Sequence, residues 1–162
     1  MEDFKVLVVD DEEDFVKTLS ERLEMRDLKP DVAMNGEQAL EKVQREEPPV
    51  MILDLKMPGM DGLEVLRKVK KAYPKTQVII LTGKGTKKDE EEARKIGAFA
   101  YLRKPVEMDV LVETMKQAHE KFKKVKHEVD TAFMAAALAA TGEVDLAREM
   151  MEEEQKEKKQ KK

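Results

Sequence analysis

The chain has 162 residues, of which 41% are apolar and 41% charged, with a net charge of −4 and no cysteine. This length suits one ordinary domain with a small appendage, and the lack of cysteine excludes both a disulfide framework and thiolate metal ligands. Residues 119–162 hold ten basic and ten acidic side chains, which leaves 21 basic and 25 acidic ones in residues 1–118. Neither part has the positive excess expected of a nucleic-acid-binding domain.

Two features of the sequence argue against export or membrane insertion. Met1 is followed by the acidic residues Glu2 and Asp3, which is unlike a signal peptide. The longest apolar run, AFMAAALAA at 132–140, is too short to cross a bilayer. We therefore expect a cytoplasmic protein with no membrane partner.

Five short apolar runs predict β-strands. The weakest, LKPDVA at 28–33, is the second along the chain. The others are KVLVV at 5–9, VMIL at 50–53, QVIIL at 77–81 and AFAYL at 98–102. Continuous apolar strands are typical of a parallel sheet that is buried on both faces.

Stretches with helical spacing separate these runs. The fourth of them, TKKDEEEARKIG at 86–97, is highly charged and stops at Gly97. In the first three, apolar residues recur every three or four positions, at Phe15, Leu19 and Leu23, at Ala39, Leu40 and Val43, and at Leu63, Leu66 and Val69. Strands that alternate with helices predict an α/β fold, here a doubly wound five-stranded parallel sheet.

Polar side chains follow four of the five predicted strands. They are Asp10 and Asp11 after the first strand, Asp54 after the third, Thr82 after the fourth and Lys104 after the fifth. Ligands of open parallel sheets bind outside the carboxyl ends of the strands. We therefore expect three carboxylates, a hydroxyl and an ammonium group to converge at one edge of the sheet.

Three neighbouring carboxylates repel one another unless they take up protons or hold a cation. Without cysteine, and without histidine before residue 119, the cation would be a hard one with oxygen ligands. Mg²⁺ fits, because it uses one or two carboxylates, keeps several waters and accepts phosphate oxygens. An aspartate beside Mg²⁺ and a lysine is equipped to attack phosphorus and form an aspartyl phosphate. This chemistry gives a reason for Asp54 to stand at the end of a buried strand.

From about Phe4 to His119 the chain resembles the receiver domain of two-component response regulators. The matching segments are LVVDDEE at 7–13, ILDLKMPGMDGLEVL at 52–66, IILTGKG at 79–85 and AYLRKP at 100–105. Their order, spacing and placement at strand ends all agree with that family. The resemblance implies the flavodoxin-like receiver fold, which we expect to occupy residues 1–120.

The resemblance also implies the roles of the acidic residues and of one lysine. Asp54 would be the phosphoacceptor, and Mg²⁺ would be bound directly by Asp11, Asp54 and the backbone carbonyl of Lys56. Asp10 would contact the metal through water, and Lys104 would pair with the phosphoryl oxygens. The receiver would therefore depend on Mg²⁺ as its cofactor.

A second set of roles implied by the resemblance concerns signalling. Thr82 would hydrogen-bond to the phosphoryl group, and Tyr101 would turn inward as Thr82 moves, which would alter the surface around the fourth and fifth helices. The Lys104–Pro105 peptide bond would be cis. Lys56 and Lys84 each lie two positions after a site residue, where they either add positive charge near the attacking water or point to solvent.

Two other protein classes share parts of this pattern and fit it less well. A haloacid-dehalogenase-like phosphatase also uses a nucleophilic aspartate with Mg²⁺, but it requires a second acidic side chain where this chain has Lys56. A flavodoxin-like FMN carrier requires a phosphate-binding loop after the first strand, where this chain has Asp-Asp-Glu-Glu.

The residues after the receiver predict a helical extension over 121–155, followed by a charged, disordered tail over 156–162. A heptad seam continues the fifth receiver helix, and Thr141-Gly142 would end it. The seam comprises Leu111, Met115, Ala118, Phe122, Val125, Val129, Ala132, Ala136 and Ala139. Residues 143–155 could fold back and cover part of it, and we expect the two histidines, His119 and His127, to be solvated.

We therefore expect a response regulator that accepts a phosphoryl group on Asp54 from a sensor histidine kinase or a phosphotransfer protein. Its output would be contact with a downstream protein, and it would be a homodimer through its C-terminal helices. The alternative is a dimeric regulator with a compact nucleic-acid-binding module in the extension, which the zero net charge of residues 119–162 disfavours.

Overall fold

The computed structural model describes residues 4–160, which form two compact units that divide between Phe122 and Lys123. The boundary between the units lies two residues beyond the end expected for the receiver. No helix within residues 4–160 is long and apolar enough to span a membrane.

The first unit contains one parallel sheet, with strand order β2-β1-β3-β4-β5. Its strands are β1 (Lys5–Val9), β2 (Lys29–Ala33), β3 (Val50–Leu53), β4 (Gln77–Thr82) and β5 (Ala100–Arg103). All four pairings are parallel. The predicted fold class is confirmed, and β5 begins two residues later than the apolar run.

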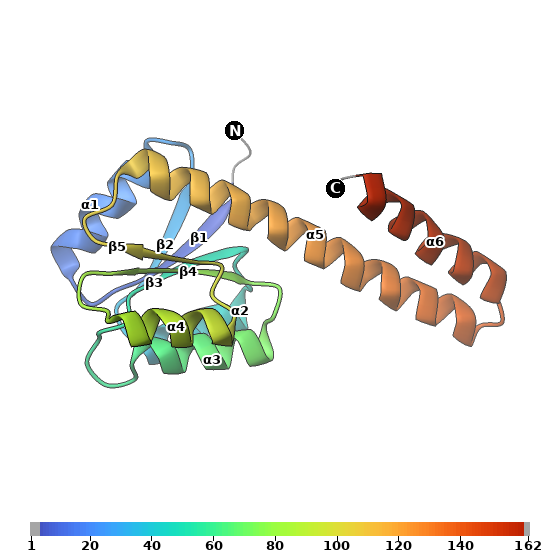
Figure 1. Cartoon of the computed structure of the whole chain (residues 1–162), viewed down its shortest axis with the longest axis horizontal. Coiled ribbons are helices and arrows are strands. Elements are labelled where there is room, and N and C mark those ends of the chain that lie inside the picture. The colour runs from blue at the N-terminus through green and yellow to red at the C-terminus, as the bar shows by residue number, and fades with distance from the viewer. Residues whose placement is uncertain (1–3, 161–162) are drawn as a thin grey trace. The chain divides into compact units, whose positions relative to one another are not determined.

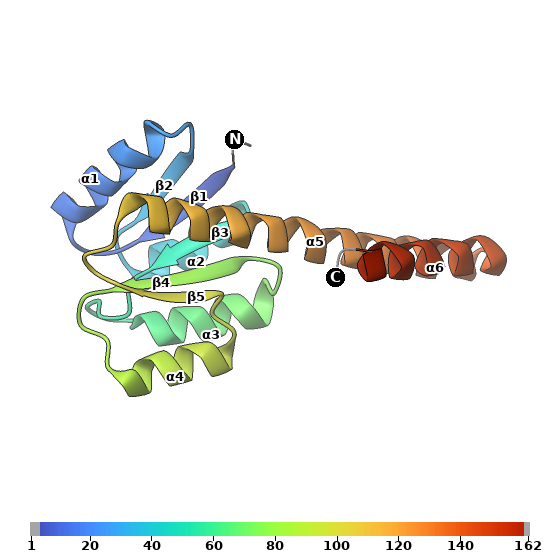
Figure 2. The same cartoon turned by 45° about the horizontal axis from the view of Figure 1, so that its top comes forward.

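Helices cover both faces of this sheet, as Figures 1 and 2 show. α1 (Glu13–Glu24) and the beginning of α5 (Met108–Ala140) pack on one face, where Val6, Val8, Ile52 and Ile79 point. The other face is covered by α2 (Gly36–Arg45), α3 (Gly62–Ala72) and α4 (Lys87–Ile96). Successive side chains of a strand point to opposite faces of the sheet, so each strand contributes alternately to two separate cores.

Polar side chains set the starts of three of these helices. The Asn35 side chain accepts a hydrogen bond from Gln38 N at the start of α2, and Asp61 accepts one from Glu64 N at the start of α3. At α4, Thr86 and Asp89 form a reciprocal capping box. Such caps satisfy N–H groups that the first turn of a helix leaves without partners.

The second unit is a helical hairpin. α5 continues without a break to Ala140, Gly142 has a φ of +91°, and α6 (Val144–Gln160) returns alongside α5 (Figure 1). The predicted long helix and its stop are confirmed. α6 includes residues 156–160, for which the sequence predicts a charged, disordered tail, and residues 161–162 lie outside the described chain.

The face of α5 that α6 covers differs from the predicted one. Thr131 and Ala135 of α5 are buried together with Ala147 and Glu154 of α6. The later positions of the predicted seam, Val129, Ala132, Ala136 and Ala139, are all exposed. α6 folds back on α5, but it packs on another side of that helix than these later seam positions.

The two histidines also differ from each other. His127 is exposed, as predicted, and its Nε2 lies 3.8 Å from Glu157 Oε2. His119 is buried, with its ring stacked on Phe4 at a centroid distance of 4.1 Å, so its predicted solvation is wrong. The aromatic face of Phe4 provides apolar cover that the helical pattern of α5 alone does not reveal.

Candidate functional site

Strand ends bring the predicted polar residues to one edge of the sheet. Asp10 directly follows β1, Asp54 directly follows β3, Thr82 ends β4 and Lys104 follows β5. Backbone hydrogen bonds continue the sheet past its formal ends, from Asp54 N to Val9 O at 3.0 Å and from Lys104 N to Thr82 O at 3.0 Å. Asp10, Asp54 and Thr82 are at most 5% exposed, so two carboxylates lie in the interior.

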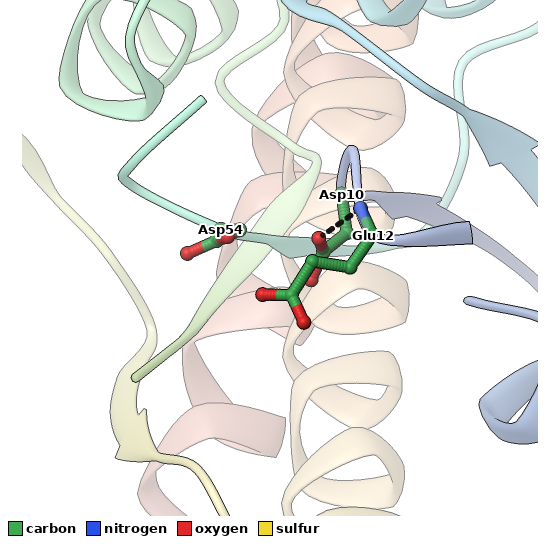
Figure 3. A group of neighbouring side chains, drawn as sticks. All are labelled: Asp10, Glu12 and Asp54. Atoms are coloured by element: carbon green, nitrogen blue, oxygen red, sulfur yellow. Dashed lines mark hydrogen bonds between the residues drawn. The ribbon is translucent and has the colours of Figure 1, made fainter. Parts of the chain in front are cut away.

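The acidic centre of the site comprises Asp10, Glu12 and Asp54, which offer carboxylate oxygens that all lie within 4.8 Å of one another. Figure 3 shows these side chains and the hydrogen bond from Glu12 N to Asp10 Oδ1, which measures 3.0 Å. Glu12 is the N-cap residue of α1, yet its side chain makes no capping hydrogen bond. Its carboxylate is thus available to the site.

The Lys104 ammonium lies among these three carboxylates. Its Nζ is 2.6 Å from Asp10 Oδ2, 3.4 Å from Glu12 Oε1 and 3.8 Å from Asp54 Oδ2. The same atom lies 3.9 Å from the centroid of the Phe15 ring, which makes a cation–π contact from α1. One ammonium group therefore balances only part of the charge of three carboxylates.

The protonation equilibria of the site reflect this imbalance. Burial raises the pKa of Asp10, although hydrogen bonds from Lys104 and from the backbone of Glu12 act in the opposite direction. Burial lowers the pKa of Lys104, but the hydrogen bond to Asp10 and the charges of Asp10, Asp54 and Glu12 outweigh it and raise that pKa overall. Both shifts favour additional positive charge at the site.

An open cavity of about 350 Å³ adjoins the acidic centre. It is lined by Asp11, Glu12, Asp54, Lys56, Gly83, Lys84 and Lys104. The backbone N–H of Lys56 lies 3.5 Å from Asp54 Oδ1, whereas its ammonium pairs with Asp89 Oδ2 at 3.3 Å. Lys56 therefore connects the cavity with the capping box of α4, while its side chain stays 46% exposed.

Thr82 and Tyr101 lie close to each other beside this cavity. The Thr82 Oγ1 accepts a long hydrogen bond of 3.4 Å from Lys84 N. Tyr101 is buried, its hydroxyl has no hydrogen-bond partner among residues 4–160, and burial raises the pKa of that phenol. A Cβ added to Gly85 would lie 1.8 Å from the Tyr101 hydroxyl, so the lack of a side chain at Gly85 makes room for the buried ring.

Gly62 makes similar room behind Asp54. A Cβ at Gly62 would lie 2.3 Å from the backbone oxygen of Asp54 and 2.6 Å from Leu55 Cα. The Gly62 N–H donates to Leu55 O at 2.9 Å. The start of α3 thus packs directly on the backbone that holds the Asp54 carboxylate in place.

The structure brings together Asp10, Asp54, Thr82 and Lys104, as the strand-end argument expected. Asp11 lines the same cavity, but the group of three close carboxylates contains Glu12 in its place. Sequence reasoning assigned no role to Glu12, although it directly follows the Asp-Asp pair. The Lys104–Pro105 bond is cis, as the resemblance implied.

The donor set fits a hard divalent cation. Three carboxylates supply oxygen ligands only, and the adjoining cavity leaves space for waters and for the oxygens of a phosphoryl group.

Residues 6–116 match the family model of the response regulator receiver domain. The chain belongs to the response regulator receiver family. Its acidic centre is typical of the phosphoacceptor pocket of that family, and a receiver domain is a phosphoacceptor, not an enzyme with a separate substrate.

Curated relatives agree with this membership. The putative NtrX-like response regulator of Rickettsia bellii is 39% identical over 127 residues, which are 77% of this chain and 27% of that protein. The sporulation initiation phosphotransferase F of Bacillus subtilis is 34% identical over 113 residues, which are 70% of this chain and 91% of that protein. For five relatives, including the Rickettsia bellii protein, this receiver chain spans only 27% to 38% of the relative's length.

Solved receiver structures share the fold. The CheY-like receiver domain protein of Methanospirillum hungatei superposes with a TM-score of 0.72 at 28% identity, covering 76% of this chain and 98% of that one. A receiver domain protein from Clostridium thermocellum gives a TM-score of 0.72 at 35% identity, with 75% and 98% covered. The family match ends at residue 116, so the helical hairpin lies outside it.

Proposed function

We propose that this receiver accepts a phosphoryl group on Asp54 in an Mg²⁺-dependent reaction and signals through protein contact. The observation that carries the proposal is the Asp54 carboxylate itself. It is nearly buried, lies at the wall of an open cavity, and has both an acidic group and the Lys104 ammonium within 5 Å. A buried carboxylate so placed is costly unless the site uses it.

Each residue of the site has a part in this reaction. An Asp54 carboxylate oxygen attacks phosphorus, and the bond to the donor breaks, so that the donor leaves with the bonding electron pair. The Lys104 ammonium pairs with the phosphoryl oxygens, which requires it to move from Asp10 toward Asp54, 3.8 Å away. The Thr82 hydroxyl donates to another of these oxygens. Mg²⁺, when bound, supplies further stabilisation of the negative charge on the transferred group.

The metal ligands that we propose are those that the resemblance to the receiver family implies. We assign direct contacts to Asp11, to Asp54 and to the backbone carbonyl of Lys56, and a water-mediated contact to Asp10. Glu12 joins this set, because its carboxylate lies within 4.8 Å of Asp10 and Asp54. Two direct carboxylates and several waters suit the octahedral preference of Mg²⁺.

The switch uses the contact between Thr82 and Tyr101. Movement of the Thr82 hydroxyl toward the phosphoryl group changes the packing beside Gly85, where the Tyr101 hydroxyl lies. The Lys56–Asp89 ion pair gives the same site a second connection, to the start of α4. Phosphorylation therefore alters the surface formed by α4, β5 and the start of α5.

The partners are proteins of a phosphorelay. The phosphoryl donor is a sensor histidine kinase or a phosphotransfer protein, and the name of the Bacillus subtilis relative, a phosphotransferase, supports transfer to or from another protein. The zero net charge of residues 119–162 argues against DNA or RNA as the target. The C-terminal hairpin serves as a homodimer contact.

Intact-protein mass spectrometry with a small phosphodonor such as acetyl phosphate tests the phosphoacceptor role. With Mg²⁺, the wild type gains about 80 Da, the mass of one phosphoryl group. Asp54→Asn gains nothing, and chelation of Mg²⁺ abolishes the gain in the wild type. Asp27→Asn is a matched control outside the site and labels like the wild type. Labelling of Asp54→Asn to the same extent would overturn the proposal.

A further inference from the structure

The second unit has an apolar face on α5 that is exposed, except at its first residue, the half-buried Val125. We define the outer face of α5 by its six apolar residues, Val125, Val129, Ala132, Phe133, Ala136 and Ala140. At 100° per residue these six positions fall within an arc of about 100°, on the side of α5 roughly opposite Thr131 and Ala135, which α6 covers. Phe133 is 74% exposed and Val129 is 49% exposed.

The outer face combines a ridge and a groove. Val125, Val129 and Phe133 are four residues apart and form a row of large side chains. Ala132, Ala136 and Ala140 have the same spacing and form a row of small ones beside it. Rows with a spacing of four residues are the ridges and grooves through which helices pack on one another.

This arrangement is complementary to itself in one orientation. In an antiparallel pair of α5 helices centred between Ala132 and Phe133, each large residue meets an alanine. The facing pairs are Val125 with Ala140, Val129 with Ala136, and Phe133 with Ala132. A parallel pair would instead set large residues against large ones and leave gaps between facing alanines, and alternating large and small residues pack better.

The hairpin also needs further apolar contacts. Within residues 123–160, its buried side chains are two alanines, Ala135 and Ala147, and the polar Thr131 and Glu154. One carboxylate oxygen of Glu154 has no hydrogen-bond partner in the part of the chain that the structure describes. Two helices with so small an apolar core are marginal by themselves, and an additional pair of helices is the usual remedy.

We propose that a second copy of this chain packs antiparallel on the outer face of α5, with the two-fold axis between Ala132 and Phe133. This deepens the homodimer of the proposed function by assigning its surface and register. Self-complementarity selects a second copy over an unrelated protein, because the ridge and the groove on one helix match each other.

Sedimentation of the full chain tests the surface. The wild type is expected to sediment as a dimer at tens of micromolar. Val129→Glu places a charge on the outer face and is expected to give a monomer. Met134→Glu is the matched control, since Met134 is 51% exposed on the same helix but lies outside the outer face. It is expected to remain a dimer. A monomeric wild type, or equal effects of both substitutions, would overturn the proposal.

Cross-linking tests the register, and the absence of natural cysteine makes single-cysteine variants unambiguous. Ala132→Cys is expected to form a disulfide-linked dimer under mild oxidation, because residue 132 lies next to the axis. Ala140→Cys is expected to remain uncross-linked, because two antiparallel copies of residue 140 lie about 22 Å apart along the helix at 1.5 Å per residue. Cross-linking of both variants would indicate a parallel pair, and failure of Ala132→Cys would contradict the register.

The same samples separate this proposal from the phosphoacceptor proposal. Val129→Glu is expected to gain a phosphoryl group from acetyl phosphate as the wild type does, because Val129 belongs to the second unit, whereas the residues of the site belong to the first. Loss of dimerisation with intact labelling confirms the surface. Labelling that fails in every variant contradicts the proposed function and leaves the cross-linking result to stand by itself.

Discussion

Replacing Asp54 with asparagine should make the receiver more stable when no divalent cation is present. Two carboxylates lie within 4.8 Å of the Asp54 carboxylate, and each repels it by about 3.5 kcal/mol at an effective dielectric constant of about 20. The Lys104 ammonium at 3.8 Å attracts it by about 4.4 kcal/mol on the same scale. Glu12 is 59% exposed, so solvent screens its share of the repulsion. The net gain from Asp54→Asn is about 1–2 kcal/mol.

Thermal denaturation in the presence of a chelator measures this gain. A stabilisation of about 1–2 kcal/mol raises the melting temperature by about 2–8 °C for a chain of this size. Excess Mg²⁺ should then reverse the order, because a cation at 100 times its Kd stabilises the wild type by about 2.7 kcal/mol and the variant has lost a ligand. Asp27→Asn removes a carboxylate elsewhere and should change neither value. The reasoning is refuted if Asp54→Asn is no more stable than the wild type in chelator, or if Mg²⁺ stabilises both equally.

Three further substitutions test other parts of the structure. Gly85→Ala should displace the Tyr101 ring and cost about 1–3 kcal/mol of stability from overpacking. The control Gly83→Ala should leave the ring and the stability unchanged, because its Cβ would have only ordinary contacts of 3.7 Å or more. Unchanged Tyr101 ring resonances in Gly85→Ala would contradict the predicted displacement. Glu154→Leu should stabilise the hairpin by about 1–3 kcal/mol, because it removes a buried oxygen without a partner, and a lower helical melting temperature would disprove it. Asp89→Asn should cost about 1 kcal/mol of capping energy. Hydrogen bonding from the Thr86 backbone holds the pKa of Asp89 below 3.8. Urea unfolding should therefore show a larger free energy of unfolding for the wild type than for the variant above that pH, and this difference should disappear as the pH falls through the lower folded pKa.

The sequence predicted the site well where it depends on strand ends. Asp10, Asp54, Thr82 and Lys104 each follow or end an apolar run, and in a parallel sheet this placement alone brings them together. Glu12 could not be assigned in this way, because the direction of its side chain depends on the backbone at the start of α1. The Lys56–Asp89 pair joins residues 33 positions apart and has no local pattern.

The extension was predicted only in part for a related reason. Helical periodicity identifies an apolar stripe on α5, but it does not reveal which face α6 will cover. The observed contact uses Thr131 and Ala135, where small side chains permit close approach, and it leaves the larger Val129 and Phe133 outside. The predicted disorder after residue 155 was based on charge alone, and α6 tolerates that charge because most of its residues are exposed.

Localisation of the phosphoryl group tests the central claim most directly. Borohydride reduction of an aspartyl phosphate converts that aspartate to homoserine, which peptide mass spectrometry can place on a single residue. After incubation with acetyl phosphate and Mg²⁺, the account predicts homoserine at Asp54 and at no other aspartate. Homoserine at Asp10 or Asp11 in place of Asp54, or its absence from a fully folded, Mg²⁺-saturated sample, would contradict the assignment of Asp54 as the phosphoacceptor.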